Sequence, residues 1–311
     1  MSKTKELLDN KGQTPDERVK AAEALEAVND EARKNWDDPA WRRDMAALLT
    51  ESIREGFDLN SMFPTIVETK NLGFEERYIL EEDTGLSVYA IAKGGHIEAS
   101  AMVSETMEIP RDTLGFHVYE FEDKLRANFG ETIGTLRNLA VKRLDWGVNK
   151  ALKDLVEAGV PNGNPEYISA VGVSQASLDQ AIREVRDASI TGEVSVWGRG
   201  TMTDQISGFT GFADEALEEI RKRGRIGVYR GANIVQTNNY KDELGVSFMP
   251  ANEMYVISGD AGLFALYGGL LSKEYVEPDN WYWHYVGRQD FGGVMHHVER
   301  VRRFVDTAIT P

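Results

Sequence analysis

The stretch from Glu120 to Val160 constrains this chain most, because its pattern predicts one long helix. Gly130 and Gly134 predict a kink in this helix, and Gly159 predicts its end. At 1.5 Å per residue, forty residues make a helix of roughly 60 Å, more than the diameter of a small globular domain. We therefore expect an elongated molecule. Apolar residues recur in the stretch at spacings of three and four, at Leu125, Phe129, Ile133, Leu136, Ala140, Leu144, Val148, Leu152 and Leu155.

Residues 1–66 are polar and predict two helices. The first begins at Pro15, a residue favoured at the first helical position, and runs to Lys34. The second begins at Pro39 and is expected to end at Gly56. Because the apolar stripe of each helix is narrow, we expect this segment to be an arm that docks on another surface.

Residues 67–119 change to a period of two, which indicates β-strands. Apolar residues alternate from Leu86 to Ala92 and again from Ile97 to Val103, on either side of a turn at Lys93–His96. Nine acidic and three basic residues lie between Glu68 and Glu108, a charge of about −6. Since an isolated two-stranded ribbon is marginally stable in water, this acidic hairpin is expected to lie on another surface.

Residues 164–270 predict a compact α/β region, with a strand at Tyr167–Val173 and a helix that opens at Ser177. The tail from residue 271 is extended and rich in aromatic residues. The pattern predicts an α+β chain with five parts: a helical arm at 1–66, a hairpin with flanking strands at 67–119, the long helix at 120–163, the α/β region at 164–270 and the tail at 271–311.

Composition excludes several classes of function. The chain has no cysteine, which excludes disulfides, thiolate zinc sites, iron–sulfur clusters and cysteine catalysis. No apolar run approaches the ~20 residues of a membrane helix, so we expect a soluble, intracellular protein with no membrane partner. A net charge of −16 disfavours tight, unspecific binding of nucleic acid over a broad surface.

The run Gly172-Val-Ser174-Gln-Ala176 nearly matches the Gly-x-Ser-x-Gly nucleophile elbow. Its fifth position is Ala, and no His-Gly-Gly run for an oxyanion hole precedes it. A strand–turn–helix corner is therefore the favoured interpretation, and a serine hydrolase is the enzyme alternative. Such an enzyme would use Ser174 as nucleophile, Asp260 as the acid and His284, His296 or His297 as the base.

Other candidate motifs are incomplete. His297 and Glu299 are metal-ligand residue types, but two ligands are too few for a site. The glycine-rich segments Trp197–Met202 and Gly259–Gly262 complete neither a dinucleotide-binding motif nor a phosphate-binding loop. The basic cluster Arg221–Arg223 lies at a predicted helix C-terminus, where the helix dipole favours it. We therefore expect no catalytic residues, no metal and no cofactor.

One stretch, together with the order of the parts, carries a resemblance. It contains Glu215-Ala-Leu-Glu-Glu-Ile-Arg-Lys-Arg-Gly224, then Ile226-Gly-Val-Tyr-Arg-Gly-Ala-Asn-Ile-Val-Gln-Thr-Asn238, then Pro250-Ala-Asn-Glu-Met-Tyr-Val-Ile257. A helix, a glycine, a strand, a tight glycine turn, a strand, a loop and a strand follow one another. Over residues 67–311 the chain resembles the major capsid proteins of tailed bacteriophages, whose fold is shared with encapsulin shells.

The resemblance implies the fold of that family. Residues 67–119 would form the extended E-loop, and residues 120–163 the spine helix of the peripheral domain. Residues 164–270 would form the axial domain around five- and sixfold openings. The tail 271–311 would return to the peripheral domain, and residues 1–66 would be the N-terminal arm.

The resemblance also implies a function, that of a structural protein and not an enzyme. Its hexamers and pentamers would build an icosahedral shell that encloses double-stranded DNA. The implied partners are further copies of the chain, portal and scaffold or decoration proteins, and packaged DNA held by loose contact. The implied location is the virion, assembled in the bacterial host cytoplasm. An encapsulin-like compartment that packs protein cargo is the alternative within this class.

The charge pattern adds a hypothesis about contacts between subunits. Glu81, Glu82 and Asp83 of the acidic hairpin would lie across Lys142 and Arg143 on the long helix of a neighbour. Each exposed pair is worth only about 0–1 kcal/mol, so the strength must come from repetition over many contacts.

A covalent contact is a second hypothesis. Some members of the family crosslink an E-loop lysine to an asparagine of a neighbouring subunit. Lys93 at the predicted hairpin tip and Asn280 in the tail are residues of these types.

Overall fold

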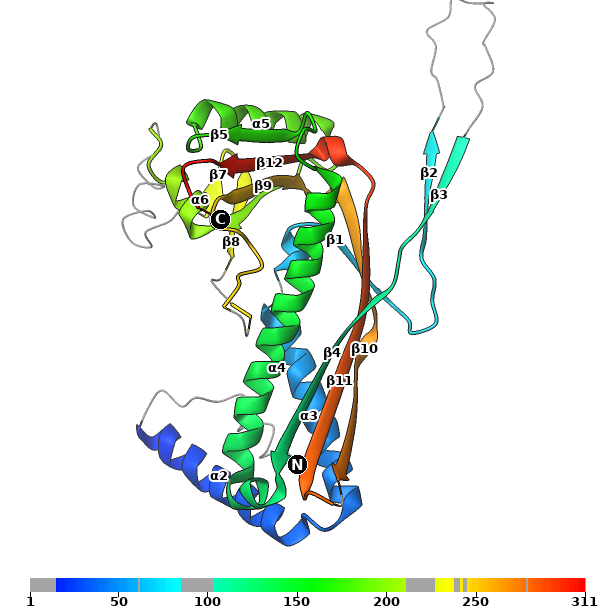
Figure 1. Cartoon of the computed structure of the whole chain (residues 1–311), viewed down its shortest axis with the longest axis vertical. Helices are drawn as coiled ribbons and strands as arrows, with labels where there is room; N and C mark the ends of the chain where they lie inside the picture. The colour runs from blue at the N-terminus through cyan, green and yellow to red at the C-terminus, as the bar shows by residue number, and fades with distance from the viewer. Residues whose placement is uncertain are drawn as a thin grey trace, which may run out of the picture.

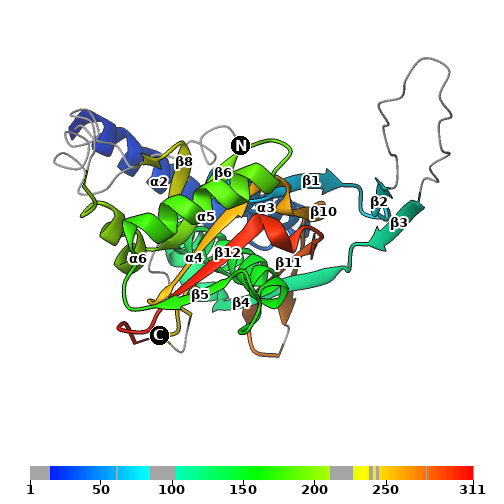
Figure 2. The same ribbon diagram turned by 90° about the horizontal axis from the view of Figure 1, so that it is seen from above.

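A computed structural model describes residues 15–60, 62–84, 103–210, 227–237, 241–242, 245–277 and 279–310. The molecule is elongated, and helix α4 (Glu122–Gly159) runs along its length beside a sheet (Figure 1). A second sheet with helices lies at one end of α4, and a two-stranded ribbon projects to the side (Figures 1 and 2). The predicted α+β class and the elongated shape are confirmed.

The arm forms two helices, α2 (Pro15–Asn35) and α3 (Pro39–Asn60), which begin at the predicted prolines. The predicted end of α3 at Gly56 is wrong. A Cβ added to Gly56 would lie 3.0 Å from Val141 Cγ2 of α4, so this glycine permits close packing of the two helices. Phe57 is buried directly after it and extends the apolar face of α3.

Helix α4 matches the predicted long helix, but its break lies elsewhere. The non-helical residue is Asn128, with φ −146° and ψ 58°, rather than Gly130 or Gly134. The predicted apolar residues from Leu125 to Leu152 are buried, whereas the last one, Leu155, is half-buried and its neighbour Val156 is buried. The periodicity therefore located the buried face of the helix correctly.

A four-stranded sheet packs along α4 in the order β1-β10-β11-β4. Strands β10 and β11 pair antiparallel, as do β11 and β4, whereas β1 pairs parallel with β10. The two strands that flank the predicted hairpin region, β1 and β4, therefore belong to this sheet. The bounds are β1 (Glu68–Leu72), β4 (Asp112–Phe121), β10 (Gly262–Glu277) and β11 (Tyr282–Met295).

The second sheet has six strands in the order β5-β12-β9-β6-β8-β7. Its strand β12 comes from the tail, which is thus divided between the two sheets. The predicted helix around Arg221–Arg223 lies outside the described residues. The bounds are β5 (Tyr167–Ala170), α5 (Gln175–Ala188), β6 (Val194–Arg199), α6 (Gly200–Ile206), β7 (Val228–Tyr229), β8 (Ala232–Thr237), β9 (Glu253–Ser258) and β12 (Val301–Asp306).

Strand β2 (Ile79–Thr84) pairs antiparallel with β3 (Val103–Glu108) to form the projecting ribbon (Figure 1). The predicted turn at Lys93–His96 and, apart from Val103, the predicted strands on either side of it lie outside the described residues, so the hairpin itself stays a prediction. The described strands β2 and β3 directly precede and follow that segment and pair antiparallel.

Two main groups of buried side chains hold the fold together. The larger group joins α3, α4 and the inner face of the four-stranded sheet, and includes Trp36, Phe264 and Tyr285. The smaller group lies between α5 and the six-stranded sheet, around Leu178 and Val256. In the part of the chain that the structure describes, no helix is both long and apolar enough to cross a membrane.

Candidate interaction surfaces

The hydrolase alternative fails on geometry. Ser174 is the N-cap of α5, where its Oγ accepts a hydrogen bond from the Ser177 backbone N–H at 3.1 Å. Asp260 lies at the other end of α5, where it accepts hydrogen bonds from Ser189 Oγ at 3.0 Å and from the Ile190 N–H at 2.7 Å. Since α5 has 14 residues, about 20 Å separate its two ends. Ser174 and Asp260 therefore cannot belong to one triad.

The candidate histidines are engaged elsewhere. His297 Nδ1 lies 3.1 Å from Glu299 Oε1, so the two residue types singled out by sequence are in contact. His284 Nδ1 lies 2.9 Å from His117 Nε2 on the neighbouring strand, and its ring stacks on Tyr275. Among the described residues, no three or more metal-ligand side chains gather in one place.

The ribbon is fixed firmly at its base. Arg111, which follows β3, donates from Nε to Asp290 Oδ2 at 3.2 Å and from Nη1 to the Phe74 carbonyl at 2.7 Å. Burial would raise the pKa of Asp290, but hydrogen bonds from Thr113 and Arg111 lower it below its usual range. Arg111 also lies over the rings of Phe74 and Tyr267. The base is thus clamped to the four-stranded sheet.

Beyond this base the ribbon stands apart from both sheets. Within the described residues, strands β2 and β3 pair only with each other. Their register places Glu81 opposite Thr106, Glu82 opposite Glu105 and Asp83 opposite Ser104. Two acidic residues directly opposite each other destabilise a ribbon.

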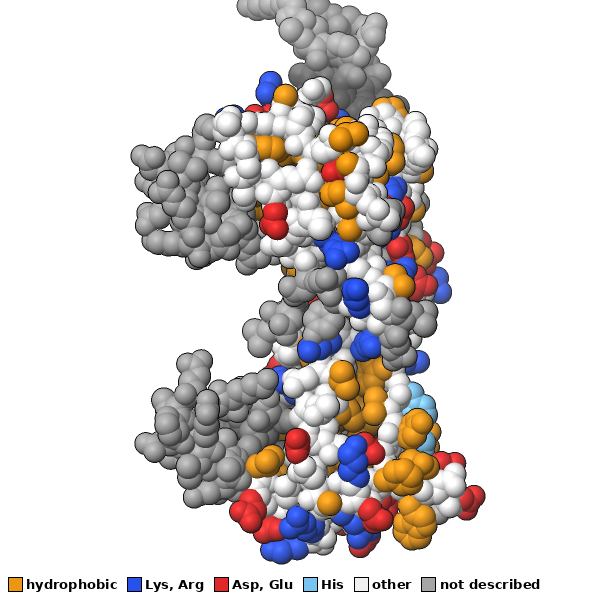
Figure 3. All heavy atoms as spheres, turned by 60° about the vertical axis from the view of Figure 1, so that its left-hand side comes forward, with side chains coloured by type: hydrophobic (Ala, Val, Ile, Leu, Met, Phe, Trp, Pro, Cys, Tyr) orange, Lys and Arg blue, Asp and Glu red, His pale blue; other side chains and the backbone are white. Residues whose placement is uncertain are grey.

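The basic residues proposed for contact with the acidic hairpin lie near the middle of α4. Lys142 is exposed and Arg143 is half-buried. Exposed Leu139 lies one turn before them, so the surface combines positive charge with an apolar side chain. Figure 3 shows several Lys and Arg side chains along the middle of the face it presents.

Of the two crosslink candidates, only Asn280 lies in the described part of the chain. It is exposed in the turn between β10 and β11, at the opposite end of the molecule from the ribbon β2–β3 (Figure 1). Lys93 lies outside the described residues, so the crosslink stays a prediction.

The same turn ends in exposed aromatic side chains. Trp281 is 66% exposed and adopts a left-handed backbone conformation, with φ 55°. Phe121 and Tyr282 lie beside it on paired strands, with ring centroids 4.2 Å apart. Trp283 and Tyr285 instead point into the core. The aromatic tail predicted from sequence thus has a buried and an exposed part.

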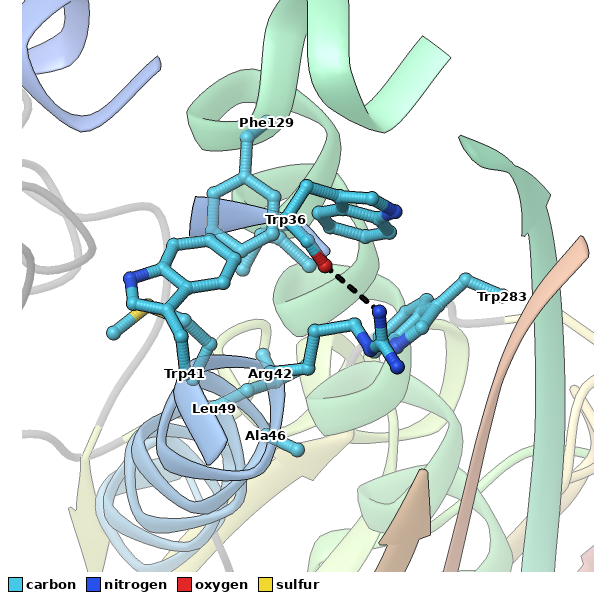
Figure 4. Close-up of a pocket in the computed structure, with 9 residues that line it drawn as sticks. Trp36, Trp41, Arg42, Ala46, Leu49, Phe129 and Trp283 are labelled. Atoms are coloured by element: carbon cyan, nitrogen blue, oxygen red, sulfur yellow. Dashed lines mark hydrogen bonds between the residues drawn. The ribbon is translucent and has the colours of Figure 1, made fainter. Parts of the chain in front are cut away.

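The corner between α2 and α3 packs against α4. Trp36, Trp41 and Phe129 form a ring cluster with centroid separations of 5.4–6.2 Å (Figure 4). Arg42 Nη1 donates to the Trp36 carbonyl at 2.7 Å and holds the corner closed (Figure 4). The predicted docking of the arm thus takes place, in part, on the chain's own long helix.

A buried ionic network, which sequence reasoning missed, joins α4 to the six-stranded sheet. Arg303 Nη2 lies 2.7 Å from Glu157 Oε1 and 2.8 Å from Glu253 Oε1. Lys153 contacts both carboxylates from α4. Burial would raise the pKa of Glu157, but Lys153 and Arg303 lower it below its usual range. The only sequence signal for this network was the presence of charged residues at core-facing positions.

Comparison with solved structures shows what this fold is similar to. An "asymmetric unit of bacteriophage PhiM1 mature capsid" matches with a TM-score of 0.58 and 11% identity, over 81% of this chain and 88% of the other. A "capsid of native GTA particle" matches with a TM-score of 0.56 and 11% identity, over 78% and 89%. A Microbacterium phage Oxtober96 structure matches with a TM-score of 0.54 and 14% identity, over 79% and 90%.

Comparisons at the level of sequence find nothing. No protein-family model matches the chain. No curated protein matches it either. The likeness is therefore one of fold.

Proposed function

We propose that this chain, which has the fold of bacteriophage capsid proteins, is a major capsid protein. Its hexamers and pentamers would build an icosahedral shell around double-stranded DNA. The observation that carries the proposal is the projecting ribbon β2–β3, which is clamped at its base and pairs with no other strand in the described part of the subunit. Such a ribbon is marginal alone and requires a neighbour.

Charge supports one mode of contact between subunits. Glu81, Glu82 and Asp83 on β2 would lie across Lys142 and Arg143 on α4 of an adjacent copy. The ribbon region carries nine acidic against three basic residues, whereas this part of α4 exposes basic and apolar side chains. Each pair contributes about 0–1 kcal/mol, and repetition around a closed shell multiplies it.

The other proposed partners are those that a DNA-containing shell requires. A subunit with a net charge of −16 would line the interior without binding DNA phosphates tightly, so packaged DNA would be held by loose contact only. Portal and scaffold or decoration proteins would complete the particle. The subunit would assemble in the bacterial host cytoplasm and reside in the virion, and it would have no enzymatic activity.

Electron microscopy and sedimentation of the purified protein test the proposal. We expect closed shells, or rings of five and six subunits. If only monomers or dimers form, both alone and on co-expression with the proteins encoded beside it, the proposal is wrong. Shells that contain protein cargo in place of DNA would indicate a compartment of the encapsulin kind.

Charge reversal tests the contact itself. The double variant Lys142→Glu/Arg143→Glu should fold normally but assemble poorly. The matched control is Lys124→Glu/Lys150→Glu, which changes two exposed lysines of the same helix and alters the net charge equally. Adding Glu81→Lys and Glu82→Lys to the first variant should restore assembly. Normal assembly of the first variant would refute the pairing and leave the shell proposal intact.

A further inference from the structure

The break in α4 lies where α2 crosses it. In an uninterrupted helix the Gly130 N–H would donate to the Arg126 carbonyl four residues earlier. Here both groups have partners on α2. The Gly130 N–H donates to Asn29 Oδ1 at 2.9 Å, and the Arg126 carbonyl accepts from Arg33 Nε at 3.3 Å.

A third backbone group at the break is satisfied in the same way. The Ala127 carbonyl accepts a hydrogen bond from Arg33 Nη2 at 3.1 Å. Backbone groups that lose their helical partners cost free energy unless they find others. Two side chains of α2 thus supply three hydrogen bonds where a broken helix needs them.

The packing around the break fits the same arrangement. A Cβ on Gly130 would lie 2.5 Å from Leu25 Cδ1, so α2 can approach α4 this closely only because residue 130 is glycine. Next to it, Phe129 packs against Trp36, directly after α2, and against Trp41 of α3 (Figure 4). Both the shape and the polar groups of the break therefore match α2.

The local sequence lowers the cost of the break. Asn128 and Gly130 are poor helix formers, so the helix loses little by breaking there. The residues on both sides are helical, and a continuous helix would recover the hydrogen bond from Gly130 to Arg126. The contacts from α2 therefore favour the broken arrangement over a continuous helix.

We propose that α2 is a brace that holds α4 broken at Asn128, and that withdrawal of α2 lets α4 close into one continuous helix. The position of the arm then sets the angle between the first turns of α4 and the remainder. The device belongs to the single subunit, so it stands or falls independently of whether the chain builds a shell.

Distance measurement between spin labels tests the brace. The chain has no cysteine, so Asp123→Cys and Asn138→Cys, both at exposed positions of α4, place one label on each side of the break. In a continuous helix these 15 residues span about 22 Å. Asn29→Ala/Arg33→Ala should move the label distance from its native value to that of a continuous helix. Asn128→Ala, which favours the helix directly, should give the same distance.

A matched control and a second variant complete the test. Glu31→Ala/Lys34→Ala changes two exposed residues of α2 and should leave the native distance. Gly130→Ala keeps Asn29 and Arg33 but forces Leu25 away, so it should also give the continuous-helix distance. If the native distance persists both in Asn29→Ala/Arg33→Ala and in Gly130→Ala, α2 does not hold the break and the proposal is overturned.

Discussion

Arg303 on β12 donates from Nη2 to Glu157 Oε1 on α4 at 2.7 Å, a contact between residues 146 positions apart in the chain. The same nitrogen lies 2.8 Å from Glu253 Oε1 on β9. Arg303 and Glu253 are both buried. The contact between Arg303 and Glu157 therefore joins the long helix to the six-stranded sheet.

Arg303→Met should destabilise the subunit by up to about 3–5 kcal/mol, because buried Glu253 and half-buried Glu157 then keep only Lys153 as a cation. Urea unfolding of the isolated subunit measures the change. Arg77→Met is the matched control, since Arg77 is exposed and lies 3.9 Å from Glu108, and it should cost less than about 1 kcal/mol. Adding Glu157→Gln and Glu253→Gln to Arg303→Met should recover part of the loss. If Arg303→Met costs no more than the control, the network contributes little.

Asp145 on α4 should make stability depend on pH. Burial raises its pKa to about 6 from an ordinary value of 3.8, although a hydrogen bond from Asn149 opposes the shift. The folded state then binds the proton more tightly than the unfolded state, so stability falls as pH rises from about 4 to about 6. Since Asp145 is only partly buried, we expect a loss of about 1–2 kcal/mol.

Asp145→Asn should remove this dependence. Its unfolding free energy should exceed that of the wild type at pH 7.5 and approach it at pH 4. Denaturant unfolding at the two pH values measures the difference. Asp154→Asn, at an exposed position of the same helix, is the control and should preserve the pH dependence of the wild type. If Asp145→Asn raises the unfolding free energy equally at both pH values, the raised pKa of Asp145 is contradicted.

Hydrophobic periodicity and the prolines at helix starts predicted the long helix and the two helices of the arm, because each depends on residues close together in sequence. They could not predict that β1 pairs parallel with β10, since that pairing joins Glu68 to Leu263. Gly56 shows a related difficulty. A glycine required by a helix crossing has the same sequence signal as one that ends a helix, and only the approach of Val141 distinguishes them.

The features of the candidate surfaces were likewise predictable only in part. The acidic character of the ribbon follows from counting charges, and the clamp at its base does not, because Arg111 and Asp290 are 179 residues apart. The break at Asn128 also escaped prediction. The side chains that hydrogen-bond to the backbone at this break, Asn29 and Arg33, lie on α2. The sequence of α4 around Asn128 does not indicate where α2 crosses it.

The same substitution at two glycines should have opposite effects. Gly292→Ala in β11 would place a Cβ 2.0 Å from the Pro110 carbonyl oxygen, so the backbone must shift at a cost of about 1–3 kcal/mol or more. Gly134→Ala in α4 meets nothing within 4 Å and should stabilise the helix by up to about 1 kcal/mol. Thermal unfolding of both variants measures the signs. Two changes of the same sign would be inconsistent with this packing.

Ser174→Ala separates a structural serine from a catalytic one. As the N-cap of α5, Ser174 satisfies the Ser177 N–H, so its loss should cost about 1 kcal/mol of stability. Hydrolysis of a p-nitrophenyl ester should be at background level in the wild type and in the variant alike, because Asp260 lies at the far end of α5. Ser174→Gly should restore most of the lost stability, since glycine is tolerated at an N-cap. Ester turnover that is present in the wild type and absent in both variants would instead require a base near Ser174 from outside the described residues.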